Sequence, residues 1–323
     1  MSPQSAQVAS ILARLRNLAD AGELSFNDVL QRYVVERFLA RMATLPDADS
    51  VLLKGALMLQ VWGLPRARPT MDIDLLRRGA ADQQALKDLV SRCAAIRKAN
   101  DAVEFDASSL VAEAIAEEAD YVGTRIRLTA RMGNVRQRVQ IDFGVGDVVV
   151  PGPVRVEFPQ MLGGDPIRLA AYPVEAAIAE KFHVIVARDL RNSRMKDYYD
   201  IWMLAKNCRF TSGQLRRAIR STFERRGAVV PTAGPPGLTA AFHSDPMHAR
   251  QWRAFVRRIN EAELEESLPH VVDEIAESSC RRSTERCRLK SNTCGARYRP
   301  GGRPDCAIAS RPGRPETRWQ AMN

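Results

Sequence analysis

The sequence predicts an α/β protein whose first half holds a mixed sheet and whose second half is helical. Short runs in which apolar and polar residues alternate, the pattern of strands, occur before residue 165. Amphipathic helical periodicity dominates residues 166–279, and residues 280–323 show no apolar periodicity. We therefore expect an α/β core with N-terminal helices over 1–165, a helical domain over 166–279 and a basic, disordered tail over 280–323.

Two helices are expected at the start of the chain. Apolar spacing predicts a short helix over 8–20 and a longer amphipathic helix over 26–43. Ser25, with Asp28 three residues later, has the pattern of a helix N-cap. Pro46 and the acidic turn around it end the second helix.

The core is organised around the stretch 51–76. An apolar run at 51–53 predicts a strand, a helical pattern covers 56–62, and alternation over 71–76 predicts a second strand. Three apolar residues of the second strand are expected to face a core: Met71, Ile73 and Leu75.

Asp72 and Asp74 alternate with those apolar residues, so their side chains project from one face of the predicted strand. Two adjacent carboxylates repel unless a cation lies between them, and Mg²⁺ favours carboxylate oxygens. Gly55 opens a helix directly after the first strand, where N–H groups and the helix dipole favour phosphate. This order is typical of nucleotidyltransferases of the polymerase-β type. An Asp-x-Asp by itself is more often a solvated strand edge, and this alternative stays open.

A hairpin is predicted farther along the core, with strands at 121–131 and 135–143 around Gly133-Asn134. Its second strand alternates, which places Asp142 on a polar face and suggests a third metal-binding carboxylate. The alternative is a solvated hairpin aspartate. The segments before the hairpin are expected to form helices at 83–99 and 108–118 and a short strand at 103–105.

The second half is expected to contain helices at 173–190, 194–206, 211–226, 247–260 and 261–277, with a Gly- and Pro-rich loop at 227–246. Lys181 and Arg188 are seven residues apart and share a helix face, from which they could hold a triphosphate. Asp197 and Asp200 lie at i and i+3 of the next helix, and Lys196 can pair with Asp200. The alternative for all of these residues is a surface ion pair.

Composition separates the tail from the rest of the chain. Residues 281–323 hold ten Arg and one Lys against three acidic residues, and so carry +8 of the formal charge of +10. The basic character that suggests nucleic acid binding therefore lies mainly outside the core. Four of the six cysteines are widely spaced in or beside the tail, which favours free thiols over a zinc site: Cys280, Cys287, Cys294 and Cys306. No apolar run is long enough for a membrane span and no secretory signal is evident, so we expect a cytoplasmic protein.

Five segments together resemble the AbiEii/AbiGii toxin family, the nucleotidyltransferase-like toxins of type IV toxin–antitoxin and abortive-infection systems. The resemblance covers about residues 25–277. The segments that carry it are Leu53-Lys54-Gly55-Ala56, Arg68-Pro69-Thr70-Met71-Asp72-Ile73-Asp74-Leu75, Ile141-Asp142-Phe143, Glu180-Lys181-Phe182-His183 and Arg194-Met195-Lys196-Asp197-Tyr198-Tyr199-Asp200.

The resemblance implies a polymerase-β-like nucleotidyltransferase core and a role for each matching residue. The implied catalytic residues are Asp72, Asp74, Lys181 and Asp200. The implied metal ligands, for Mg²⁺, are Asp72, Asp74 and Asp142. The implied nucleotide-binding residues are Lys54, Gly55, Ala56, Arg68, Thr70, Lys181 and Arg188. Arg66 is a further candidate for a phosphate contact. The family often has Ser or Gly where this chain has Ala56, so a hydroxyl contact is absent and lower activity is expected.

The implied reaction moves a nucleotide from an NTP to an acceptor, with a tRNA 3′ end as the expected target and an antitoxin, often a DNA-binding regulator, as the expected partner. Three alternatives are considered beside it. The acceptor could be a protein or a small molecule, the chain could be a non-catalytic nucleotide- or RNA-binding module, or it could be a metal-dependent glycosyltransferase. Gly55 and Lys181 argue against the last alternative.

Overall fold

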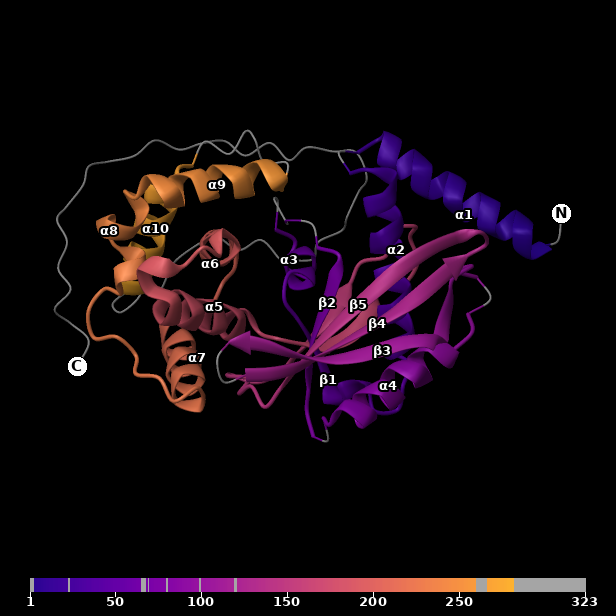
Figure 1. Cartoon of the computed structure of the whole chain (residues 1–323), viewed down its shortest axis with the longest axis horizontal. Helices are drawn as coiled ribbons and strands as arrows, with labels where there is room; N and C mark the ends of the chain where they lie inside the picture. The colour runs from indigo at the N-terminus through magenta and orange to yellow at the C-terminus, as the bar shows by residue number, and fades with distance from the viewer. Residues whose placement is uncertain are drawn as a thin grey trace. The chain divides into compact units, whose positions relative to one another are not determined.

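A computed structural model describes residues 3–22, 24–64, 68, 70–79, 81–98, 100–118, 121–259 and 266–281. The chain divides into two compact units, Met1–Ala177 and Ile178–Asn323, and each is described by itself (Figure 1). Arg66 and the tail beyond residue 281, with three of its cysteines, lie outside the described residues. Cys93 and Cys208 are free thiols. Within the described ranges, no helix is long and apolar enough to cross a membrane.

The first unit is built on a mixed seven-stranded sheet with the order β3-β4-β5-β2-β1-β7-β6. Two neighbouring pairs are parallel, β2 with β5 and β1 with β7, and the other pairs are antiparallel. This architecture confirms the predicted α/β fold. The strands are β1 (Val51–Lys54), β2 (Asp72–Arg77), β3 (Glu104–Glu118), β4 (Tyr121–Met132), β5 (Val135–Val145), β6 (Val154–Phe158) and β7 (Ile167–Ala171).

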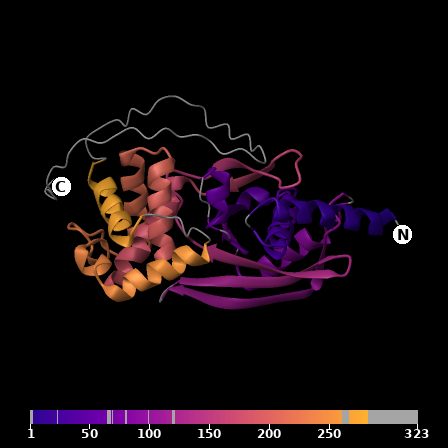
Figure 2. The same cartoon turned by 90° about the horizontal axis from the view of Figure 1, so that it is seen from above.

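Helices cover one face of this sheet. They are α1 (Pro3–Asp20), α2 (Phe26–Met42), α3 (Leu57–Val61) and α4 (Gln83–Ala95), with a 3-10 turn η1 (Ala48–Ser50) before β1. The Ser25 side chain accepts a hydrogen bond from the Asp28 backbone N–H, as the capping pattern predicts. In Figure 2 the indigo helices α1 and α2 lie on one side of the magenta strands. Ile73 and Leu75 are fully buried in the core beneath them, so the alternate residues Asp72 and Asp74 belong to the other face.

Two local predictions were wrong, and two strands were missed. Residues 103–118 do not form a short strand and a helix, because 104–118 make one long strand, β3. The Ala- and Glu-rich composition favours a helix by propensity, but pairing along β4 outweighs this weak preference. Met71 is 40% exposed and precedes β2, so it does not join the core. Strands β6 and β7 were not anticipated, since their segments are short and lie between prolines and glycines.

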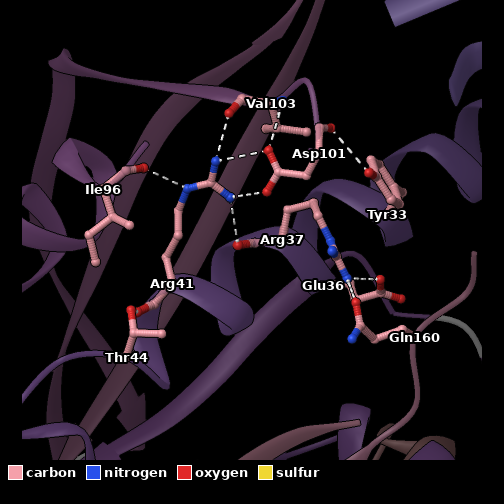
Figure 3. Close-up of polar contacts among 9 residues, drawn as sticks. All are labelled: Tyr33, Glu36, Arg37, Arg41, Thr44, Ile96, Asp101, Val103 and Gln160. Atoms are coloured by element: carbon pink, nitrogen blue, oxygen red, sulfur yellow. Dashed lines mark hydrogen bonds and ion pairs between the residues drawn. The ribbon is translucent and has the colours of Figure 1, made fainter. Parts of the chain in front are cut away.

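A buried guanidinium fixes the loop between α4 and β3. Arg41 on α2 is fully buried, and its Nη1 and Nη2 donate to the two carboxylate oxygens of Asp101 at 2.6 and 3.1 Å. The other Arg41 donors reach carbonyl oxygens of Ile96, Arg37 and Val103 (Figure 3). All five N–H groups of Arg41 therefore have acceptors, which is the condition under which a charge can be buried.

A second contact of α2 holds the loop after β6. Buried Glu36 accepts a hydrogen bond from the Met161 backbone N–H at 2.7 Å and pairs with Arg37, which also donates to Gln160 (Figure 3). Burial raises the pKa of Glu36 above its ordinary value despite the Arg37 charge. Helix α2 is thus anchored to loops beside both edge strands of the sheet, β3 and β6.

The second unit is helical. Its helices are α5 (Val174–Arg188, which begins in the first unit), α6 (Met195–Asn207), α7 (Ser212–Arg225), α8 (Ala240–His243), α9 (Pro246–Arg258) and α10 (Leu268–Arg281), with 3-10 turns η2 (Asp189–Arg191) and η3 (Pro236–Leu238). The segment predicted as a loop, 227–246, contains η3 and α8. Phe242 of α8 stacks on Tyr198 at 4.9 Å, so this segment is folded onto α6. Tyr198, Tyr199 and Trp202 are all buried in the helical core.

Candidate active site

A row of charged residues crosses the face of the sheet that lies opposite α2 and α4. Strand register pairs Lys54 of β1 with Asp74 of β2, and Asp74 with Asp142 of β5. The row continues from Asp142 to Arg125 of β4 and from Arg125 to Glu113 of β3. Residues directly opposite each other on neighbouring strands project from the same face, with strands about 4.8 Å apart. Two like-charged carboxylates, Asp74 and Asp142, therefore lie side by side at the centre of the row.

Gly55 brings the backbone directly against Asp74. Its φ of +71° is in the left-handed region that only glycine adopts without strain. A Cβ atom at this position would lie 1.9 Å from Oδ2 and 2.6 Å from Cγ of Asp74. Two constraints therefore require glycine at position 55: the positive φ angle and the space that the Asp74 carboxylate occupies. The turn after β1 thus packs directly against the Asp74 side chain.

Asp142 is held by Arg125. The Arg125 Nε and Nη2 groups donate to Oδ1 and Oδ2 of Asp142 at 2.8 and 2.7 Å, a bidentate ion pair. The hydrogen bonds that Arg125 donates to Asp142, followed by the charges of Asp142 and Asp72, raise the pKa of Arg125. Arg127, two residues along the same strand face, donates to Gln140 and pairs with Glu113.

Lys54 is directed to a different carboxylate. Its Nζ lies 3.1 Å from Oδ2 of Asp147, whose side chain is buried, and 5.6 Å from the centre of the Tyr172 ring. The Tyr172 hydroxyl is 3.4 Å from the same Asp147 oxygen. Gly144 leaves room for the lysine, since a Cβ there would lie 3.0 Å from Nζ. Lys54 is therefore fixed beside Asp74 by Asp147 and Tyr172.

The loop before β2 carries two further predicted residues. Thr70 Oγ1 lies 3.4 Å from the Asp72 backbone nitrogen, at the start of β2. Arg68 and Thr70 are both partly exposed, as are Asp72 and Asp74. Ala56 is buried and is the N-cap residue of α3, which has only five residues and so contributes little helix dipole.

Asp72 and Asp74 have the chemistry to hold a divalent cation, because they are partly exposed carboxylates on one strand face. The third predicted ligand, Asp142, has both oxygens in the Arg125 pair. Across the described ranges, no group of three or more His, Cys, Asp or Glu side chains is arranged to hold a metal ion. The residues present therefore fit a cation at the two β2 carboxylates, without a cluster of three.

The second unit contains its own charge cluster. Lys181 of α5 contacts two carboxylates of α6, with its Nζ 2.7 Å from Oδ2 of Asp200 and 3.3 Å from Oδ1 of Asp197. Arg194 donates from Nε to Oδ2 of Asp197 at 2.6 Å. The side chains of Asp200 and Asp197 are 0% and 1% exposed, whereas those of Lys181 and Arg194 are partly exposed. The contact of Lys181 with Asp200 was not predicted from the sequence, and the predicted Lys196–Asp200 pair stays a prediction.

Opposing effects act on the pKa of Asp197. Burial by itself raises it, but the charges of Lys181 and Arg194 and the Arg194 hydrogen bond outweigh burial and hold the pKa below its ordinary value. Asp197 is therefore a carboxylate that the protein keeps ionised with its own cations. Arg188, the other predicted triphosphate contact, lies in the last turn of α5 and is partly exposed.

Sequence reasoning missed Arg125 and Asp147. Arg125 could have been found from the hairpin turn, because counting outward from Gly133-Asn134 pairs Arg125 with Asp142 directly. Asp147 follows the end of β5 and has no repeating pattern around it, so no sequence signal identifies its contact with Lys54.

Comparison with known proteins places this geometry in context. A sequence profile described as "Nucleotidyl transferase AbiEii toxin, Type IV TA system" matches residues 37–277, about three quarters of the chain. No curated protein matches the sequence. Among solved structures, JHP933 from Helicobacter pylori is 13% identical with a TM-score of 0.46, covering 79% of this chain and 91% of that one. An antigenic nucleotidyltransferase-like protein from Paracoccidioides brasiliensis is 17% identical with a TM-score of 0.31, covering 71% and 91% of the respective chains.

Proposed function

Because this chain belongs to the AbiEii family of nucleotidyl transferase toxins of type IV toxin–antitoxin systems, we propose that it transfers a nucleotide from an NTP to the 3′ end of tRNA in an Mg²⁺-dependent reaction. Nucleotidyl transfer and an antitoxin partner follow from the family. The acceptor, the metal and a role in phage defence by abortive infection are parts of the proposal. So is a location in the cytoplasm, where NTPs and tRNA are present.

The observation that supports the proposal best is the contact between Gly55 and Asp74. A glycine whose Cβ would overlap the carboxylate brings backbone N–H groups, which bind phosphate, against an oxygen ligand suited to Mg²⁺. In the proposed site Asp72 and Asp74 hold Mg²⁺, which when bound would neutralise phosphate charge and orient the triphosphate.

The other matching residues would bind the nucleotide. We assign Lys54, Gly55 and Ala56 to the phosphate-binding turn, and Lys54 brings a charge that Asp147 holds in place. Arg68 and Thr70 stand at the entrance to β2 as further phosphate contacts. Lys181 and Arg188 belong to the second unit, and their contact with the triphosphate stays a prediction from the resemblance.

Asp200 has a modified role in this proposal. Its side chain is fully buried and lies 2.7 Å from the Lys181 ammonium, so direct contact with substrate does not fit its surroundings. We assign it as a positioning residue that holds Lys181, with Asp197 as the second carboxylate. The buried pair would keep the lysine extended in one conformation, which lowers the entropy cost of binding a phosphate.

Transfer is tested by incubating the full chain with each labelled NTP, Mg²⁺ and total tRNA. We expect label on tRNA with the wild-type chain and none with Asp74→Ala. Asp106→Asn is a matched control, since Asp106 is a carboxylate of the same sheet whose ion pair with Arg131 lies outside the charged row. Label on protein instead of tRNA would support a protein acceptor, and NTP binding without any transfer would support a binding module. Either result contradicts the proposed tRNA reaction.

The antitoxin partner is tested by co-expression. A small DNA-binding regulator encoded beside this chain should relieve growth inhibition by the wild-type chain. The Asp74→Ala variant should cause no inhibition with or without that regulator. Equal toxicity of both chains would contradict a toxic role for nucleotide transfer.

A further inference from the structure

The charged face of the sheet, which lies opposite α2 and α4, continues along β5 toward the hairpin turn. Arg136, Arg138 and Gln140 alternate along this face, and the residues between them face the helices, as buried Val139 does. The β2–β5 register sets Gln140 directly beside Asp72. Arg138 and Arg136 therefore lie about 7 and about 14 Å along the strand from this point. The two arginines line the approach from the turn to the candidate site.

Arg136 and Arg138 differ from the other arginines of the sheet. Both are exposed, and within the described ranges neither forms an ion pair. Each of the remaining arginines in the described strands pairs with a carboxylate: Arg77, Arg125, Arg127, Arg131, Arg155 and Arg168. In the part of the sheet that the structure describes, uncompensated arginine charge is thus concentrated on β5, beside the candidate site.

The hairpin also keeps two arginines opposite each other. In the β4–β5 register Arg136 lies directly across from Arg131. Like charges at such positions destabilise a sheet. The ion pair with Asp106 offsets the charge of Arg131, but that carboxylate belongs to β3, on the side of β4 away from Arg136. A bound anion beside Arg136 would remove the remaining repulsion.

Helix α2 fixes the backbone at Arg138. The buried Gln31 side chain donates from Nε2 to the Arg138 carbonyl oxygen at 2.8 Å, and the same nitrogen lies 3.5 Å from the carbonyl oxygen of Met71. Met71 directly precedes Asp72, the first residue of β2. One amide group therefore ties the strand that carries Arg138 to the start of the strand that carries the candidate metal ligands. A contact residue held on rigid strand backbone keeps a constant distance from the reacting centre.

We propose that Arg136 and Arg138 bind the phosphate backbone of the acceptor RNA and guide its single-stranded 3′ end along β5 to Asp72 and Asp74. The inference rests on the proposed function, in which that 3′ end receives the nucleotide. A guanidinium matches phosphate with its planar fork, and alternate positions of a strand can follow the phosphates of an extended chain. The charged-face residues of β5 include no aromatic side chain on which a base could stack. Binding should therefore depend little on RNA sequence.

Fluorescence anisotropy of a labelled single-stranded RNA, titrated with the full chain in the absence of NTP, tests this surface without reference to transfer. The double variant Arg136→Gln with Arg138→Gln should weaken binding about tenfold, because two phosphate contacts are lost. It should also make the dependence of log affinity on log salt concentration less steep by about 1.4, since each phosphate contact on a single strand contributes about 0.7.

The double variant Arg155→Gln with Arg168→Gln is the matched control. These two arginines are exposed on β6 and β7, toward the other edge of the same sheet, and each pairs with a carboxylate. The control removes the same number of positive charges and should keep the RNA affinity within about twofold of wild type. Thermal unfolding checks the fold of both variants. The β5 variant should unfold at the wild-type temperature or slightly above it, because the repulsion between Arg136 and Arg131 is gone.

Equal losses of RNA affinity in the two double variants would overturn the inference, since general charge attraction would then explain binding. An unchanged RNA affinity in the β5 variant, or no RNA binding by the wild-type chain, would overturn it as well. So would a β5 variant that loses affinity for a labelled NTP and not for RNA, because the arginines would then hold the nucleotide and not the acceptor.

The labelled-nucleotide assay separates failure of this surface from failure of the proposed function. In that assay the β5 variant should need a higher tRNA concentration for half-maximal rate, with the maximal rate nearly unchanged. A chain that labels tRNA while the β5 variant keeps full RNA affinity retains its function and loses this surface. A chain with the expected binding pattern and no transfer retains the surface and loses the proposed function.

Discussion

Asp72 and Asp74 on β2 and Asp197 and Asp200 on α6 are two pairs of neighbouring carboxylates in different surroundings. The α6 pair is almost completely buried, and Lys181 and Arg194 neutralise it from within the helical unit. The β2 pair is partly exposed, and glycine backbone lies against one of its members. The comparison teaches that the sequence pattern of paired acids does not set their role. The burial that the surrounding fold gives each pair does.

The largest expected effect is on stability and comes from the buried pair. Asp200→Ala removes the carboxylate at 2.7 Å from Lys181 and breaks a largely buried ion pair, which typically costs about 3–5 kcal/mol. Asp74→Ala removes a partly exposed charge and should change the free energy of unfolding by less than about 1 kcal/mol. Urea unfolding of both variants measures the difference. Equal losses of unfolding free energy in the two variants would contradict the difference in burial between the two pairs.

The next effect concerns the backbone beside the exposed pair. Gly55→Ala places a methyl group on Asp74 and should reduce nucleotide transfer by about 100-fold, since small displacements of a reacting group have effects of this order. Gly79→Ala is the matched control, because Gly79 also has a positive φ, +87°, but no atom within 4 Å of its Cβ position. Both variants carry backbone strain of about 1–3 kcal/mol. If both lose transfer equally, strain and not the contact with Asp74 is responsible.

The helical unit should lose folding stability as the pH falls. Burial, and then the charge of Arg226, lower the pKa of His183 from 6.5 to about 4. His183 is therefore neutral when folded and takes up a proton when unfolded below pH 6.5, so its contribution to stability is present above pH 6.5 and lost between pH 6.5 and 4. The lowered pKa of Asp197 adds a loss at still lower pH, below the ordinary Asp value of 3.8.

This prediction is measured by the urea midpoint between pH 7.5 and 4. His183→Gln keeps a hydrogen-bond acceptor for Arg226 but does not titrate. Its midpoint should fall less steeply than that of the wild-type chain over this range. Parallel curves for the two proteins would show that His183 is not the titrating group.

The smallest effect is expected where the ion pair is exposed. Arg92 pairs with Asp47 at 2.8 Å, but the Arg92 side chain is 49% exposed. Arg92→Gln should change the free energy of unfolding by less than about 1 kcal/mol. Urea unfolding at low and high salt measures this free energy. A loss as large as that of Asp200→Ala would contradict the expectation that a buried ion pair contributes more to stability than an exposed one.

The sequence predicted the parts of the fold that have strong local patterns. Ser25 capping of α2, the strand carrying Asp72 and Asp74, and the hairpin around Gly133 depend on short-range rules and were confirmed. Strand β3 was missed because a long Ala- and Glu-rich segment has helix propensity, and only its partner β4 decides otherwise. The fold class and the family, which rest on several segments together, were also confirmed.

The sequence predicted which residues form the candidate site, but it did not predict which of their charged side chains pair with one another. Asp200 pairs with Lys181, from another helix, and Lys54 pairs with Asp147, 93 residues away. Such pairs depend on tertiary packing and have no periodicity in the sequence. The roles of the predicted residues stay predictions until the variants above are measured.

The turn at Gly133-Asn134 has a consequence for how chains of this kind can diverge. Arg125 in the charged row lies seven positions before Met132 at the turn, about 23 Å along β4. A change in the length of the turn that shifted the pairing by one residue would place Thr124 or Ile126 opposite Asp142. Insertions at this distant loop would therefore alter the electrostatics of the site as much as a substitution within it. The turn length should be inherited together with the arginine.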